Sequence, residues 1–299
     1  MTKRLLATGG LLLAAASLHA QTIDDGIMMK KKALCTGFVY GHDSWTDYWE
    51  GTLKRANGNV GTVSTDTVSW MGTYGVSDRI NVVAMLPYVS THASGGTLHG
   101  QKGLQDLTLA AKLRAFSLAD DRLRAFVVAS YSVPVSDYVP DLFPLSLGMA
   151  SQHLSGRGTL NYRTAGGWYA NATAAYTWRD NVTLDRPSYF TDGQLFLTDQ
   201  VQMPNTFGYA VSLGFVRGRL QAPVSYTQQN TLGGGDIRRQ DAPFISNRMN
   251  FKRVDALVTY TVPHANGLAL RAQAARVIDG RNVGQSTTVM AGLMYTLHF

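Results

Sequence analysis

Apolar and polar residues alternate with a period of two along most of the chain, from Ala33 to Phe299. A β-strand places successive side chains on opposite faces, so this period predicts strands that each have one apolar and one polar face. About twelve strands of about ten residues each are predicted. They lie at residues 33–42, 63–75, 79–90, 103–116, 122–134, 152–163, 167–179, 206–216, 219–229, 249–262, 267–278 and 285–299.

The connections between these strands alternate in length. The short ones are 76–78, 117–121, 164–166, 217–218 and 263–266, and the others are 43–62, 91–102, 135–151, 180–205, 230–248 and the shorter 279–284. Tight turns on one rim and longer loops on the other are typical of a transmembrane β-barrel, whereas a soluble sandwich has no reason to separate them. The sequence therefore predicts an all-β, transmembrane antiparallel barrel over residues 33–299, with both termini in the periplasm.

The apolar faces of two strands fit a lipid environment. In segment 167–179, Trp168 and Trp178 end a face of alanines and a tyrosine, and their spacing corresponds to about 25 Å along the membrane normal. The last strand alternates Val289, Ala291, Leu293, Tyr295, Leu297 and Phe299 with more polar residues. An aromatic C-terminus on such a strand resembles the signature of outer-membrane proteins, which implies recognition by the barrel-assembly machinery.

The polar faces carry charges that require a lumen. In segment 103–116, leucines alternate with Lys112 and Arg114, and a basic residue at the bilayer midplane costs about 2–4 kcal/mol. The alternation assigns to the lumen Asp106, Lys112, Arg114, Arg124, Arg157, Arg163, Arg179, Arg253, Asp255 and Arg271. This net positive wall is consistent with two roles: selectivity for anions, or a network of charges that fills the barrel. A count of twelve strands does not decide between an open and a filled bore.

The first twenty residues differ from the rest. Lys3 and Arg4 precede an apolar run that ends at Leu18, and Ala20 follows. This arrangement predicts a secretory signal peptide over residues 1–20. No later stretch approaches the ~20 apolar residues of a membrane-spanning helix. Export combined with a barrel pattern predicts the cell outer membrane as the location.

Composition narrows the range of partners. The formal net charge is +7, and the basic residues are spread along the chain, so nucleic acid is not a predicted partner. Cys35 is the only cysteine, which excludes an intramolecular disulfide. The lysines before it leave no signal for a lipid anchor. Glycines 233–235 lack the Gly-Lys-Ser/Thr of a phosphate loop, and no metal or cofactor is predicted.

The segment 21–32, between the signal peptide and the first strand, has two interpretations. It begins in the periplasm and either folds up into the lumen, with Ile27, Met28 and Met29 as a plug, or forms a disordered lead-in whose lysines stay in water. We favour the lead-in.

The long loops contain candidate functional residues. Residues 180–205 are predicted to form a folded hairpin, and residues 230–248 to fold over the mouth through salt bridges as part of a ligand entry site. The charged candidates are Asp185, Arg186, Asp236, Arg238, Arg239 and Asp241. In the first loop, Trp45, Tyr48 and Trp49 are predicted to lie in the membrane interface or to line an apolar entrance.

An enzymatic alternative rests on His153 and Ser155. A His-x-Ser pair near the external leaflet is similar to the catalytic pair of outer-membrane phospholipases and deacylases, and two residues apart in a strand share a face. The alternation places both in the lumen, however, whereas those enzymes act on the lipid side. Gly156 follows the serine where asparagine is usual.

Two segments carry a family resemblance. Tyr74 to Val82, leading into Leu86-Pro87-Tyr88, and Gly103 to Thr108, followed by Lys112-Leu113-Arg114, resemble the outer-membrane family named for the MetA pathway of phenol degradation. Gln105 stands where a glycine is common in that pattern. The resemblance implies a barrel that passes small organic compounds, often hydrophobic or aromatic. It supplies no catalytic residues, no cofactor and no defined substrate.

Together these observations predict a channel or ligand-gated conduit for small organic solutes that performs no chemistry. The alternatives are an outer-membrane lipid hydrolase that uses His153 and Ser155, and a structural or adhesion barrel that acts through its external loops. The expected partners are outer-membrane lipids, the barrel-assembly machinery and a small-molecule solute.

Overall fold

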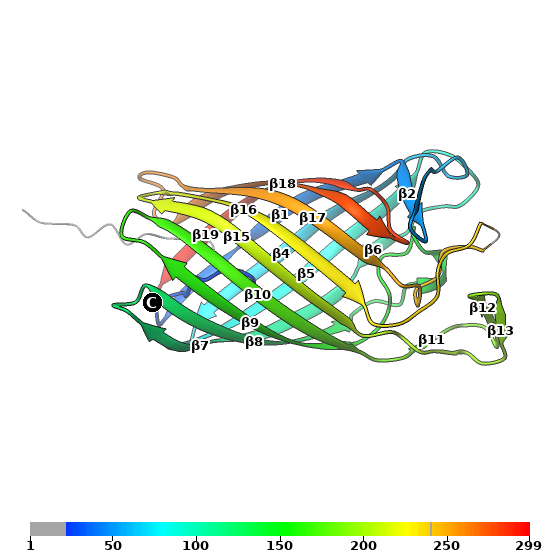
Figure 1. Cartoon of the computed structure of the whole chain (residues 1–299). Helices are drawn as coiled ribbons and strands as arrows, with labels where there is room; N and C mark the ends of the chain where they lie inside the picture. Colours follow the sequence, from blue (N-terminus) through cyan, green and yellow to red (C-terminus); the bar gives the residue numbers. More distant parts are fainter. Residues whose placement is uncertain (1–21, 240) are drawn as a thin grey trace, which may run out of the picture.

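In the computed structural model, which describes residues 22–239 and 241–299, twelve long antiparallel strands form a closed barrel (Figure 1). The strands are β1 (Ala33–Trp45), β4 (Val63–Gly75), β5 (Ile80–Ala93), β7 (Asp106–Leu118), β8 (Leu123–Pro134), β9 (His153–Arg163), β10 (Trp168–Arg179), β15 (Thr206–Arg217), β16 (Leu220–Thr231), β17 (Asn250–Thr261), β18 (Leu268–Arg281) and β19 (Thr287–His298). The predicted fold class is confirmed. The predicted signal peptide, residues 1–20, lies outside the described residues.

The barrel closes between its first and last strands. Each long strand pairs with its neighbours in sequence, and β1 pairs with β19 from Ala33 opposite His298 to Ser44 opposite Thr287. The N–H of Phe299 donates a hydrogen bond to the carbonyl of Lys32 at 3.1 Å. Closure of this kind satisfies the backbone groups that an open sheet would leave at its edges.

No helix among the described residues is long and apolar enough to cross a membrane.

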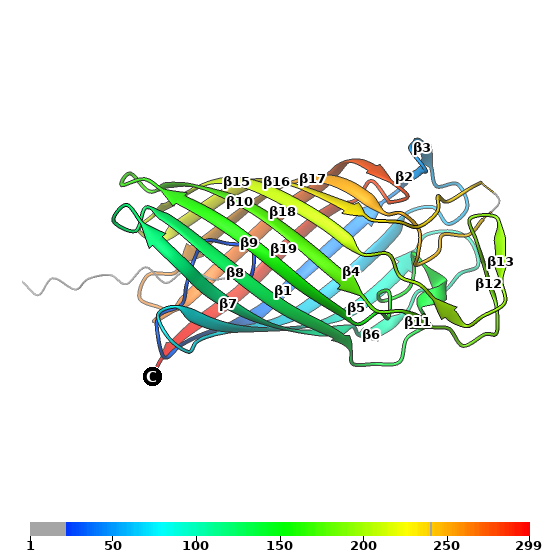
Figure 2. The same cartoon turned by 60° about the horizontal axis from the view of Figure 1, so that its bottom comes forward.

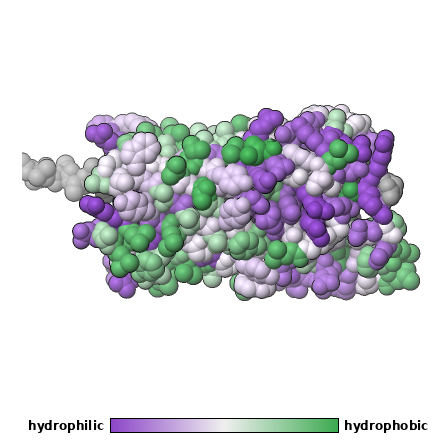
Figure 3. Space-filling model, in the orientation of Figure 1, coloured by the Kyte–Doolittle hydropathy of each residue, from purple (hydrophilic) through white to green (hydrophobic). Residues whose placement is uncertain are grey.

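The outer face of the barrel is apolar, as the alternation predicts. Leu213 is 69% exposed, Val224 60% and Leu293 57%. Figure 3 shows hydrophobic side chains along the flank of the barrel and hydrophilic ones gathered towards the loop end. Exposure of large apolar side chains over a whole wall is costly in water and favourable in hydrocarbon, so this face contacts lipid.

Several strands are longer than predicted at the loop end, and two contain bulges. β1 continues to Trp45 and β18 to Arg281, because their polar ends still pair; Thr288 on β19, for example, donates to Asp43 at 2.6 Å. The register shifts between Arg114 and Phe116 on β7, and opposite Lys252 and Arg253 of β17, where Ile278 is the extra residue on β18. The first shift turns Phe116, 44% exposed, towards lipid, although strict alternation would place it inside.

The external loops fold into ordered structure beyond the barrel (Figure 2). Their short elements are β2 (Asp47–Glu50), β3 (Leu53–Ala56), β6 (Lys102–Leu104), η1 (Pro140–Leu142), β11 (Val182–Thr183), β12 (Tyr189–Thr191), β13 (Gln194–Phe196) and β14 (Gln200–Val201). β12 pairs with β13 and β11 with β14, which confirms the hairpin predicted in 180–205. A buried cluster that includes Tyr189, Val201, Phe244 and Ile245 joins this hairpin to the loop before β17.

Candidate functional site in the lumen

The N-terminal segment, residues 22–29, lies inside the barrel, so the predicted solvated lead-in is wrong for these residues. Ile23 packs against a buried apolar cluster on β5, β7 and β8. Met29 is buried in the same cluster as Cys35 on β1. Residues 30–32 are exposed, as expected of lysines at the rim. The segment has no periodic pattern because charge contacts and a few apolar side chains hold it, not a β ladder.

Lys112 on β7 holds this segment. Its Nζ donates to the carbonyl of Thr22 at 2.9 Å, the carbonyl of Asp25 at 2.7 Å and Asp25 Oδ1 at 2.8 Å. Its side chain is 0% exposed, and the ammonium lies 5.4 Å from the ring centre of Phe126. An ammonium has three N–H donors, so the segment accepts a hydrogen bond from each of them.

A second ion pair joins the segment to β9. Asp24 pairs with Arg157, whose side chain is 19% exposed, while the side chain of Asp24 is 68% exposed. Sequence reasoning assigned Lys112 and Arg157 to the lumen but did not assign them acidic partners. The sequence did contain a signal, because Asp24 and Asp25 are adjacent acidic residues in the segment that precedes the first strand of a barrel with a basic wall.

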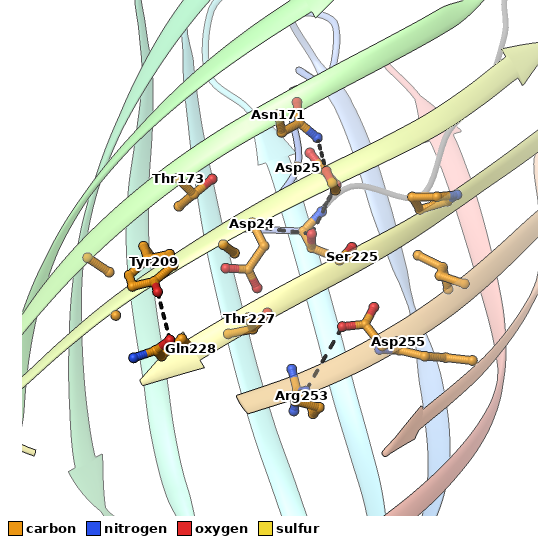
Figure 4. Close-up of a pocket in the computed structure, with 18 of the residues that line it drawn as sticks. Asp24, Asp25, Asn171, Thr173, Tyr209, Ser225, Thr227, Gln228, Arg253 and Asp255 are labelled. Carbon is orange, nitrogen blue, oxygen red and sulfur yellow. Dashed lines mark hydrogen bonds and ion pairs between the residues drawn. The ribbon is translucent and has the colours of Figure 1, made fainter. Parts of the chain in front are cut away.

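A cavity of about 440 Å³ lies beside the segment, between it and the walls formed by β9, β10 and β15 to β18 (Figure 4). Its charged lining residues are Asp24, Asp25, Arg157, Arg253, Asp255 and Arg271. Its neutral polar lining includes Asn171, Thr173, Ser225 and Thr227. Figure 4 shows the two aspartates of the segment together with Asn171 of β10 and Ser225 of β16, which line the same cavity. The cavity therefore offers hydrogen-bonding groups of both kinds and charges of both signs.

The wall formed by β9, β10 and β15 is held by hydrogen bonds between side chains. Asn161 Nδ2 donates to Asn171 Oδ1 at 2.6 Å, and Asn171 Nδ2 donates to Ser212 Oγ at 2.9 Å. Further along, Gln221 on β16 donates to the hydroxyl of Tyr169 at 3.3 Å. Such a continuous network fixes the positions of its members.

The arginines of β17 and β18 are held more loosely. Arg253 Nε lies 4.0 Å from Asp255 Oδ1, the limit for an ion pair, and its guanidinium lies 5.9 Å from the ring centre of Phe251. Arg271 Nη2 donates to Gln273 Oε1 at 3.5 Å. Both guanidiniums line the cavity. Arg271 also interacts electrostatically with Asp25 and Asp255, but among the described residues neither guanidinium has a carboxylate closer than 4.0 Å, so both remain able to bind a solute.

Other predicted lumenal residues lie near the turn end. Arg114 Nη1 and Arg124 Nε approach Asp121 carboxylate oxygens at 3.7 and 3.5 Å, and Arg124 Nε also donates to the carbonyl of Asp121 at 2.9 Å. Arg163 lies over the ring of Tyr169, 5.9 Å from its centre. The periplasmic mouth is therefore basic, with Asp121 in contact with two of its arginines.

Two further predicted residues lie near the loop end. Asp106, at the start of β7, accepts a hydrogen bond from the hydroxyl of Tyr138 at 2.8 Å. Burial in loop 135–152, together with this nearby carboxylate, raises the pKa of Tyr138 above its usual range. Arg179 ends β10, and its backbone N–H donates to Asn205 Oδ1 at 2.9 Å. Neither residue borders the central cavity.

The charged residues of the external loops form several separate contacts. Arg281 Nε and Nη2 donate to the two carboxylate oxygens of Asp236 at 2.7 and 2.5 Å. These hydrogen bonds, with one from Asn282, lower the pKa of Asp236 to about 2. Arg238 pairs with Asp241 at 2.7 Å and Arg186 with Asp141 at 2.8 Å. Asp185 and Arg239 are exposed.

The aromatic residues of the first loop lie at the entrance to the lumen. Trp45 borders a second cavity of about 250 Å³ together with Arg253 and Val277. Trp49 is 6% exposed and donates from its backbone N–H to Val283 at 2.9 Å.

His153 and Ser155 lie on the lumenal face of β9 but bind different partners. The ring of His153 contacts the carbonyl of Ser151 at 3.2 Å. Ser155 Oγ accepts a hydrogen bond from the hydroxyl of Thr177 at 3.1 Å. The histidine is therefore not placed as a base for the serine hydroxyl.

Across the part of the chain that the structure describes, no group of three or more His, Cys, Asp and Glu residues is arranged to hold a metal ion.

A closed barrel with an apolar outer wall and a polar cavity defines an outer-membrane β-barrel protein. The family model described as "Putative MetA-pathway of phenol degradation" matches residues 55–293, so the chain belongs to that family, as the resemblance in sequence predicted. A comparison with curated proteins finds no match.

Solved structures show the same fold. The chain is similar to an outer membrane channel from Pseudomonas putida F1, with a TM-score of 0.74 and 13% identity over 92% of this chain and 100% of that chain. It is also similar to the NanC porin, with a TM-score of 0.50 and 7% identity over 87% of this chain and 100% of that chain. At these identities the likeness concerns the fold.

Proposed function

We propose that the protein is an outer-membrane channel for small organic solutes, including aromatic ones. The observation that carries the proposal is the cavity of about 440 Å³ inside a closed barrel, which the chain lines with polar groups and loosely held arginines. Pockets of about 300–1,000 Å³ accommodate small organic ligands. The Pseudomonas putida protein of similar fold is described as an outer membrane channel, which supports the same role here.

The chemistry of the lining supports solutes that combine a compact body with polar groups. Asn171, Thr173 and Ser225 provide hydrogen bonds, while Tyr169 and Phe251 provide ring faces within the same cavity. Rings of basic side chains favour anions in pores, so Arg253 and Arg271 support passage of solutes that carry negative charge.

Conductance in planar bilayers tests this function. The full chain should give discrete current steps, and Thr173→Trp, which fills the cavity, should reduce their size severalfold. Ala172→Trp is the matched control: Ala172 is the adjacent residue of β10 and faces lipid, so its current steps should match those of the unmodified protein. Equal currents from Thr173→Trp and Ala172→Trp would mean that ions do not pass through this cavity.

A second candidate, attachment through the external loops, is favoured by the β12–β13 hairpin. Phe190, Leu195 and Leu197 are 50%, 61% and 83% exposed there, beyond the barrel. Replacement of these three residues by serine should reduce the binding of cells to apolar surfaces while leaving conductance unchanged. Unchanged binding would exclude this hairpin as an attachment site.

A further inference from the structure

The ammonium of Lys112 is buried and fully bonded, and the N-terminal segment supplies all of its acceptors. Among the described residues, Asp25 is the carboxylate within ion-pair distance of it. Removal of one partner from a buried ion pair leaves an uncompensated charge, which is strongly unfavourable. The segment can therefore leave this position readily only when another anion replaces Asp25.

The cavity gives an anion a route to this position. Arg253 and Arg271 line the cavity that Asp24 and Asp25 also border. Arg157 borders the same cavity and pairs with Asp24, whose side chain is largely exposed. An anion held by the arginines of β17 and β18 is therefore in the same cavity as both carboxylates of the segment, Asp24 paired with Arg157 and Asp25 paired with the buried Lys112.

The acidic side chains of the segment have the same functional group as an organic carboxylate. Asp24 and Asp25 each present a carboxylate to a lumenal cation, and the neighbouring apolar side chain of Ile23 packs against the cluster on β5, β7 and β8. A small molecule with a carboxylate on an apolar body would present the same combination of groups.

We propose that Lys112 and Arg157 form a binding site for organic carboxylates, which Asp24 and Asp25 occupy in the resting protein. A carboxylate solute that enters the cavity replaces these two side chains and releases residues 22–29 from the lumen. This inference rests on the proposed channel function and adds to it a class of solute and a means of opening.

The test compares benzoate with benzamide, its neutral analogue of similar shape, in planar bilayers at constant chloride. For the unmodified protein, benzoate should raise the open probability about tenfold or more, because it binds the open state better, whereas benzamide should not. Lys112→Gln should remove the response to benzoate and open the channel without it. Lys252→Gln, the same replacement on the outer face of β17, should respond like the unmodified protein.

Release of the segment is measured separately. Ile23→Cys in a Cys35→Ser background should react with a maleimide several times faster in benzoate than in benzamide, because Ile23 leaves its packed position. A shift in gel mobility between boiled and unboiled samples verifies that each variant is folded. Asp24→Asn/Asp25→Asn complements Lys112→Gln. This second variant removes the resident carboxylates instead of the cation, and its channel should also open without benzoate.

The outcomes separate this inference from the proposed function. If Asp24→Asn/Asp25→Asn conducts while the unmodified protein responds equally to benzoate and benzamide, the channel stands and the carboxylate exchange is wrong. An increase in conductance without faster labelling at residue 23 would likewise overturn the exchange. If neither protein conducts under any condition, the proposed channel function itself fails.

Discussion

Two carboxylates that lie outside the barrel strands each bind a cationic side chain on a strand. The hydrogen bonds have similar lengths, but one cation is buried and the other is partly exposed. Asp25 accepts a hydrogen bond from Lys112 at 2.8 Å inside the lumen, and Asp236 accepts two from Arg281 at 2.7 and 2.5 Å at the external rim. Lys112 is 0% exposed, whereas the side chains of Arg281 and Asp236 are 32% and 36% exposed. Water competes for the pair at the rim and not for the buried ammonium of Lys112, so contacts of similar length differ in energy.

The difference implies two kinds of attachment. The inner segment is held by a pair that cannot be weakened gradually, because an ammonium that stays buried without a counter-charge is strongly unfavourable. The outer loop is held by a pair that exchanges with water and salt at little cost. A buried contact such as that of the inner segment suits a switch that responds to a competing anion. A partly exposed contact such as that of the outer loop serves to order the loop.

The largest expected effect follows from Asp25→Asn. This change removes the counter-charge of Lys112, so the folded protein loses the stabilisation that the bound segment provides. The free energy of unfolding by urea in lipid vesicles should fall by about 3–5 kcal/mol. Asp255→Asn removes the same charge from the same lumen. The side chain of Asp255 is 11% exposed, but its contact with Arg253 is 4.0 Å long and that cation is 38% exposed, whereas Lys112 is 0% exposed. That control should cost less than about 1 kcal/mol. Equal losses would show that burial does not distinguish these pairs.

A smaller effect is expected at the rim. Asp236→Asn removes the ion pair with Arg281 but keeps an oxygen that accepts a hydrogen bond, so the loss should be about 1 kcal/mol or less in the same measurement. Added salt should reduce the difference between this variant and the unmodified protein, because partly exposed charges are screened. A loss as large as that of Asp25→Asn would contradict the comparison.

The barrel was predictable because the bilayer imposes a simple rule on each strand. Lipid on one face and the lumen on the other fix the alternation, so Lys112 and Arg157 could be assigned to the lumen from sequence alone. Phe116 shows the limit of the rule. A bulge of one residue reverses the facing of everything after it, and nothing in the alternation marks its position.

The candidate site was only half predictable, because its ion pairs join residues far apart in sequence. Asp25 lies 87 residues before Lys112, and its segment has no period that would indicate its location. The loop shows the same contrast: Arg238 and Asp241 pair three residues apart, as their spacing suggests, whereas Asp236 binds Arg281, 45 residues away. Such pairs depend on the closed barrel and become visible only when it is formed.

The smallest expected effect is a pH dependence confined to the external loop. Because hydrogen bonds from Arg281 lower the pKa of Asp236 to about 2 from an ordinary 3.8, the ion pair contributes fully above about pH 4 and is lost as the pH falls through about 2.

Pepsin, which is active across this range, should cut loop 232–249 slowly at pH 4 and faster near pH 2. Asp236→Asn has no carboxylate to protonate, so the ratio of its cleavage rate to that of the unmodified protein should fall from above one at pH 4 towards one at pH 2. This ratio cancels the pH dependence of pepsin itself. A ratio that stays constant between pH 4 and pH 2 would show that the Asp236–Arg281 pair does not hold the loop.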